Sequence, residues 1–156
     1  MYAYLLPLHS FLRWAIVILG VVAAARGFMG WRGNRPWQQA DDRAGLLFVA
    51  SLVVQLLVGL LLYLVFSPLA AAARRDLGAA MGSSILRFYG IEHPFGMVVA
   101  AIVANVGRIL ARRDRPARAK HRIAALFFLA ALLIIVISIP WPLVPAGAGR
   151  PWFRLR

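Results

Sequence analysis

The hydrophobic positions of the chain gather in four blocks, at about residues 5–27, 44–66, 91–110 and 123–143. Each block is about 20 residues long, which at about 1.5 Å per residue is enough to cross a hydrocarbon core of about 30 Å. A membrane-spanning β-strand would be about half as long and would alternate apolar and polar residues. The pattern therefore predicts an all-α fold over residues 1–156, an integral membrane four-helix bundle in one domain.

A short interfacial helix is predicted between spans two and three. Ser67 followed by Pro68 is typical of a helix N-cap and first helical position, and the helix should run to about Met81. Its mixture of alanines with Arg74, Arg75 and Asp76 favours a position on the outer surface. The segment from Gly82 to Ser84 should end it.

Local signals set the other boundaries. Asp41 and Asp42 precede the second span and suit its N-cap, while Pro140 and Pro142 should stop the fourth span. The first block lacks the basic start of a secretory signal and Arg13 interrupts it, so we expect this span to be retained.

Composition narrows the class of protein. The chain is 62% hydrophobic and 15% charged, whereas a soluble domain carries about 25% charged residues. The absence of cysteine excludes disulfides, thiolate metal sites and thioether-linked haem. The net charge of +13 does not indicate nucleic-acid binding, because the basic residues lie between the spans and not along one soluble face.

The basic residues instead predict orientation. Eleven of the 18 lie in the connections between spans one and two and between spans three and four. The positive-inside rule then places these two connections in the cytoplasm and both termini outside, in a bacterial inner membrane. The dense run at residues 108–122 favours contact with anionic lipid head groups over a protein-partner site. The basic and aromatic tail at 150–156 should lie in the outer interface.

Polar residues inside the spans mark inward faces, because such side chains are costly in lipid. His9 and Arg13 are four residues apart, and Gln55, Gly59 and Tyr63 repeat the same spacing in the second span. We expect Gln55 and Tyr63 to form interhelical hydrogen bonds. The fourth span offers only Ser138 and should be the most lipid-exposed helix.

His9 and His93 both lie near outer ends of spans, so the four-span topology places them at one depth on two helices. Two imidazoles can hold one haem b from opposite faces, whereas zinc or copper would need further ligands. Arg13 and Arg87 lie at a depth suited to the haem propionates. Phe88, Phe95 and Trp14 could pack against the macrocycle. The alternative is that each histidine simply meets water and head groups.

The third histidine is expected to stand apart from this pair. His121 begins the fourth span at the opposite end, about a membrane thickness away, beside Lys120 and Arg122. We therefore predict a solvated loop residue there, and one haem at most.

Four motifs give the chain a family resemblance. It resembles short bacterial four-helix membrane proteins labelled cytochrome b-like, nearly end to end, through the motifs Leu8-His9-Ser10-x-x-Arg13-Trp14, Gln55-x-x-x-Gly59-x-x-x-Tyr63, Arg87-Phe88-x-x-x-Glu92-His93 and Ile139-Pro140-Trp141-Pro142. The resemblance implies a haem b carrier in a respiratory or redox assembly, with His9 and His93 as axial ligands. Compared with the more distant cytochrome b561 fold, the chain lacks a second histidine pair, and Pro94 suggests a helix start at His93.

These observations lead to two hypotheses. The first is a b-type cytochrome that passes electrons between a quinol or enzyme partner and an outer acceptor, as a carrier or accessory subunit and not as a stand-alone enzyme. The second is a haem-free accessory subunit of a larger membrane complex. A small transporter is disfavoured, since no inverted repeat or broken helix pair is visible. The sequence leaves oligomerisation open.

Overall fold

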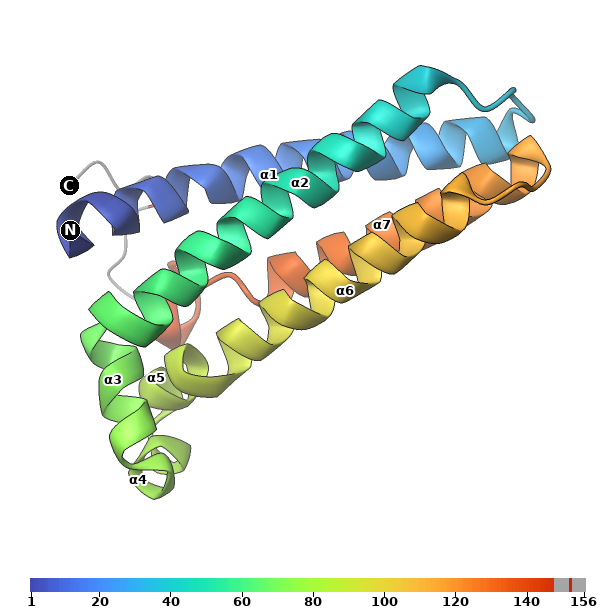
Figure 1. Ribbon diagram of the computed structural model, residues 1–156. Helices are drawn as coiled ribbons and strands as arrows, with labels where there is room; N and C mark the ends of the chain where they lie inside the picture. The colour runs from blue at the N-terminus through green and yellow to red at the C-terminus, as the bar shows by residue number, and fades with distance from the viewer. Residues whose placement is uncertain (148–151, 153–156) are drawn as a thin grey trace.

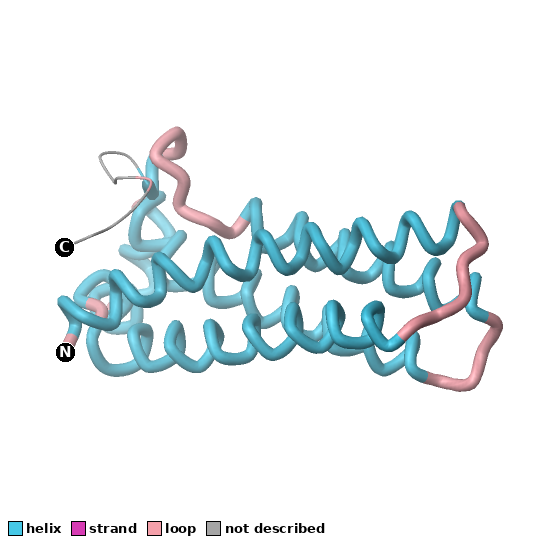
Figure 2. The backbone as a smooth tube through the Cα atoms, turned by 90° about the horizontal axis from the view of Figure 1, so that it is seen from above, coloured by secondary structure: helices cyan, strands magenta, loops and turns pink. Residues whose placement is uncertain are grey.

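The computed structural model describes residues 1–147 and Trp152, so the predicted tail at 150–156 falls almost entirely outside the described residues. Four long helices lie side by side in an antiparallel bundle (Figure 1). They are α1 (Tyr2–Arg32), α2 (Gln39–Leu61), α6 (His93–Arg112) and α7 (Ala117–Ile137). The connections α1–α2 and α6–α7 lie together at one end of the bundle (Figure 2).

All four helical segments are long and apolar enough to cross a membrane, namely Tyr2–Arg32, Gln39–Phe66, Ser84–Arg112 and Ala117–Ile137. This confirms the all-α, four-span prediction and suggests a multi-pass membrane protein in a lipid bilayer. The fourth span is displaced from its predicted range. Helix α7 begins at Ala117 and ends at Ile137. It ends there because the prolines at 140 and 142, which cannot continue a helix, follow shortly after.

Three short helices, and not one, follow the second span. They are α3 (Pro68–Arg75), α4 (Leu77–Gly82) and α5 (Ser84–Arg87). The prediction of a single helix to Met81 was wrong because Asp76 adopts an extended conformation, with ψ 94°, and its side chain accepts a 2.9 Å hydrogen bond from the Ala79 amide to start α4. Ser67 caps α3 as predicted, by accepting from Ala70 at 3.2 Å. Whether this segment lies at the membrane surface stays a prediction.

A π-helical turn flanks each side of these short helices. The turn η1 (Leu62–Phe66) ends α2, and η2 (Phe88–Glu92) leads directly into α6. The α-helix α6 begins at His93, as Pro94 suggested, but the backbone before it is already helical from Ser84 through α5 and η2. Pro94 cannot donate to the carbonyl of Gly90, four residues earlier. The Tyr63 hydroxyl donates to that carbonyl instead, at 3.0 Å.

The core shows which helices are neighbours. Helix α1 packs on α2 and α7, and α6 packs on α7 and α2, so α1 and α6 stand on a diagonal. Phe48 and Phe128 meet edge to face at 5.7 Å in the centre. The prediction that α7 is the most lipid-exposed helix was wrong, because a larger share of α7 than of α1 is buried. The buried face of α7 includes three alanines, which allow α1 and α6 to approach closely.

The start of α2 is tied to α1 by Asp41. Gln38 is the N-cap residue, and Asp41 at the third helical position accepts from the Gln38 amide at 2.9 Å and from Arg26 Nε at 2.9 Å. Asp42 instead pairs across the bundle with Arg112 at 3.3 Å. The expectation that these aspartates form the N-cap itself was therefore wrong, although Asp41 completes the capping box.

We expect Asp41→Asn to lower the free energy of unfolding by about 1–2 kcal/mol, because it weakens a cap and a charge-assisted bond at a side chain that is 9% exposed. Denaturation of the purified protein in detergent would measure this. Asp114→Asn is the matched control, since it removes the same charge from an exposed position in the other connection. Equal losses in the two variants would contradict a specific role for Asp41.

Candidate functional site

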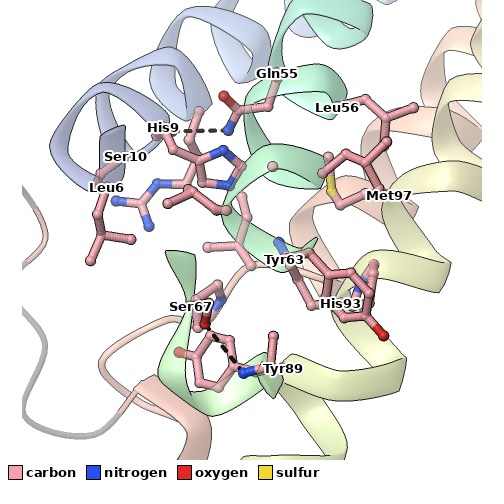
Figure 3. A pocket seen from close by; sticks show the side chains of 18 of the residues that line it. Leu6, His9, Ser10, Gln55, Leu56, Tyr63, Ser67, Tyr89, His93 and Met97 are labelled. Carbon is pink, nitrogen blue, oxygen red and sulfur yellow. Dashed lines mark hydrogen bonds between the residues drawn. The ribbon is translucent and has the colours of Figure 1, made fainter. Parts of the chain in front are cut away.

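The structure brings His9 and His93 together across the interior. They project from α1 and α6, the diagonal helices, and their ring centroids are 6.1 Å apart with the ring planes at 78°. Figure 3 shows both rings at one cavity, approaching it from different helices. The two histidines thus meet at one level of the bundle, and their depth in a membrane stays a prediction.

The cavity between them has a volume of about 180 Å³ and lies at the end of the bundle that carries the short helices. Its wall combines polar groups from three helices with apolar side chains. Leu60 of α2 and Val98 of α6 also line it, and these residues are 48% and 43% exposed. The cavity therefore opens toward the lipid-facing surface between α2 and α6.

His93 is held by the end of α7. Its Nδ1 lies 2.7 Å from the carbonyl oxygen of Ser138, which stands just beyond the last turn of that helix. A carbonyl oxygen only accepts, so Nδ1 carries the hydrogen and the lone pair of the neutral ring is on Nε2. Phe88 stacks on the imidazole at 5.8 Å and 27°. The ring is thus fixed both in orientation and in tautomer.

His9 is held by the polar stripe of α2. Gln55 donates to the His9 carbonyl oxygen at 2.9 Å. A Cβ at Gly59 would stand 3.0 Å from His9 Cε1, so this glycine leaves the space that the imidazole occupies. The predicted stripe is therefore a support for the site: Gln55 and Tyr63 form interhelical hydrogen bonds, as expected, and Gly59 makes room.

Several polar atoms at the cavity lack protein partners. His9 Nδ1, Gln55 Oε1 and Arg13 Nε are buried and accept or donate no hydrogen bond within the described residues. All three side chains line the cavity. A buried polar atom without a partner costs about 1–3 kcal/mol, so such a cluster indicates a place for a polar ligand or water.

The two predicted arginines take different places. Arg13 lines the cavity, its guanidinium donates to the Trp152 carbonyl at 2.8 Å, and it lies over the rings of Trp14 and Trp141. Arg87 is not among the described residues that line the cavity, and it forms a 2.6 Å ion pair with Glu92. A propionate-binding role for Arg87 stays a prediction without support from its position.

The aromatic residues that were expected to pack on the site also take different positions. Phe88 contacts His93, as expected. Phe95 is 69% exposed and points away from the interior, so the expectation that it packs on the site was wrong. Trp14 contacts Trp141, at 5.9 Å, and borders the site through Arg13.

No group of three or more histidine, cysteine, aspartate or glutamate side chains is close enough to hold a bare metal ion within the described part of the chain. The donor set at the cavity consists of two imidazoles, which suits an iron that brings its own equatorial ligands.

His121 corrects the sequence interpretation. We expected a solvated loop residue, but His121 lies within α7 and is 2% exposed. Its ring packs against Trp37 at 4.8 Å and against the backbone of Gly30. The neighbouring Lys120 and Arg122 suggested solvent, yet one turn of a helix carries both exposed and buried positions.

The chain was compared with protein-family models, with curated proteins and with solved structures, and none of the three comparisons gave a match.

Proposed function

We propose that the protein is a membrane b-type cytochrome that binds one haem between His9 and His93. The observation that carries the proposal is the placement of these imidazoles on diagonal helices with centroids 6.1 Å apart. An imidazole–metal bond is about 2.0 Å and a ring nitrogen lies about 1.1 Å from the ring centre, so two axial imidazoles have centroids about 6 Å apart. The spacing therefore suits a single iron.

The surroundings of the pair support the same function. A carbonyl acceptor on the second nitrogen fixes a ligating histidine and raises its basicity, and Ser138 offers this to His93. Arg13 offers a cation at the cavity wall for a propionate. The cavity of about 180 Å³ is smaller than a usual cofactor pocket, so a macrocycle held there would extend outward through the opening beside Leu60 and Val98 toward the lipid face. When bound, the haem would supply one-electron redox chemistry.

The proposed role is an electron carrier or accessory subunit in a bacterial inner membrane. An opening on the lipid-facing surface favours a lipid-soluble quinol, or a redox subunit docked in the membrane, as the partner. The resemblance to cytochrome b-like proteins supports this role, and the charge bias supports an orientation with both termini outside.

The absorption spectrum of the purified protein tests the proposal. We expect a Soret band that shifts on reduction, with about one haem per chain by pyridine haemochrome assay. The protein must be produced with haem supplied, so that the cofactor is not limiting. A preparation that is folded and haem-free under these conditions would overturn the proposal. Comigration of such a preparation with a larger complex would favour the alternative, a haem-free accessory subunit.

A further inference from the structure

A second cavity lies at the opposite end of the bundle, beneath the α1–α2 connection. It has a volume of about 160 Å³ and is lined mainly by polar residues of α1, the connection, α2 and α7. The lining residues that carry polar side chains are Arg26, Arg35, Gln38, Asp41 and His121. None of them belongs to the proposed haem site.

His121 is the unexplained group in this cavity. The side chain is 2% exposed, and neither Nδ1 nor Nε2 has a hydrogen-bond partner within the described residues. The ring is fixed between Trp37 and the backbone of Gly30, where any side chain at position 30 would overlap it. Burying ring nitrogens without hydrogen bonds costs free energy, so we expect a molecule bound in the cavity to be the hydrogen-bond partner of His121.

The charged groups around His121 indicate whether that partner is a cation or an anion. Both carboxylate oxygens of Asp41 already accept bonds, one from Arg26 and one from the Gln38 amide. Two guanidinium groups, those of Arg26 and Arg35, thus line the cavity together with a single carboxylate, and both oxygens of that carboxylate already accept a bond. The lining therefore carries more positive charge and more hydrogen-bond donors than its one carboxylate balances, which disfavours a metal cation and favours an anion.

We propose that this cavity binds a phosphate group, with Arg35, Arg26 and His121 as donors. Arginine matches phosphate geometry through its planar fork of N–H groups. Met29 also lines the cavity and is 50% exposed on the apolar surface of α1, so an acyl chain can continue outward from it. The phosphate is therefore that of an anionic lipid head group or of a free phosphate ion.

Lipid and phosphate binding to the full chain in neutral detergent test the site. Phosphatidylglycerol, diacylglycerol with the same acyl chains, and inorganic phosphate are each titrated, with thermal shift and native mass spectrometry as readouts. We expect 1:1 binding of phosphatidylglycerol that inorganic phosphate displaces. Binding of inorganic phosphate without lipid would also support the site and identify a free ion as its ligand. Equal binding of phosphatidylglycerol and diacylglycerol, with no effect of phosphate, would overturn it.

Variants separate the cavity from the general charge of the connection. Arg35→Gln is expected to weaken binding about tenfold, as for the loss of one charge-assisted hydrogen bond. Arg32→Gln is the matched control, because Arg32 is exposed in the same region and does not line the cavity. His121→Phe keeps a ring against Trp37 and should give a similar loss. Equal weakening by Arg32→Gln and Arg35→Gln would overturn the proposal. These readouts do not depend on haem.

Discussion

Replacing His93 with alanine is expected to abolish stable haem binding, and replacing His9 is expected to do the same. Loss of a group that merely orients a metal ligand costs about 10–100-fold in metal affinity, so loss of the ligand itself should cost at least as much. The haem content per chain after purification, measured from the Soret band, should fall to near zero in both variants. The helical content should stay close to that of the wild type, since both rings line a cavity and not the packed core.

Added imidazole distinguishes a ligand from a structural residue. His93→Gly leaves a space in which free imidazole can replace the missing ring, and haem binding should return with the spectrum of a bis-imidazole complex. The matched control is His121→Asn, which removes a histidine at the other end of the bundle. Retention of a wild-type Soret band by either His93→Ala or His9→Ala would contradict the assignment.

The shared level of His9 and His93 in the bundle could be predicted because it depends on topology alone. Four spans of similar length place both histidines near the same membrane face, and the structure confirms that they meet. Hydropathy identified the spans because backbone groups in lipid must be satisfied within a helix. The position of each helix end was less predictable: Asp76, for example, caps a new helix where the alanine-rich pattern indicated continuation.

Inward faces were harder to predict than spans. In a membrane helix both the lipid-facing and the core-facing surfaces are apolar, so the pattern that marks the core of a soluble helix is weak. The sequence pattern therefore does not indicate which face of α7 points inward. His121 has basic neighbours, which suggested that its side chain is exposed to solvent. The only sequence signal for its burial was a glycine, Gly30, on the facing helix, and a lone glycine has many uses.

The use of Tyr63 was only partly predictable. Its hydroxyl donates to the Gly90 carbonyl, 27 residues away in the sequence, to which Pro94 has no N–H to donate. Spacing within the second span indicated that Tyr63 faces inward, but the sequence did not predict the π-helical turn η2, which carries the Gly90 carbonyl and packs against α3. A contact of this kind follows from the assembled bundle and not from either segment alone.

Gly27→Ala is expected to destabilise the protein by about 2 kcal/mol, because the new methyl group would strike the backbone of α7. A Cβ at position 27 would stand 2.6 Å from the Ala125 amide nitrogen and 2.8 Å from its Cα. These atoms belong to a helix backbone and cannot rotate away, so α1 and α7 must separate. Alanine in a helix interior would otherwise gain about 1 kcal/mol over glycine. The sign of the measured change therefore tells which effect dominates.

Alanine substitutions at two further glycines serve as controls for Gly27→Ala within the same protein. At Gly20 the nearest atoms are the tips of Phe48 and Leu132 at 2.9 and 3.0 Å, which can shift, and at Gly82 nothing lies within 4 Å. Because the space around the three glycines differs while the substitution is the same, we expect a graded series. Gly82→Ala should leave the free energy of unfolding within about 0.5 kcal/mol of the wild type, Gly20→Ala should lower it slightly, and Gly27→Ala should lower it most. Denaturant titration in detergent would measure all three. A Gly27→Ala protein as stable as Gly82→Ala would show that α1 and α7 are not in backbone contact at this point.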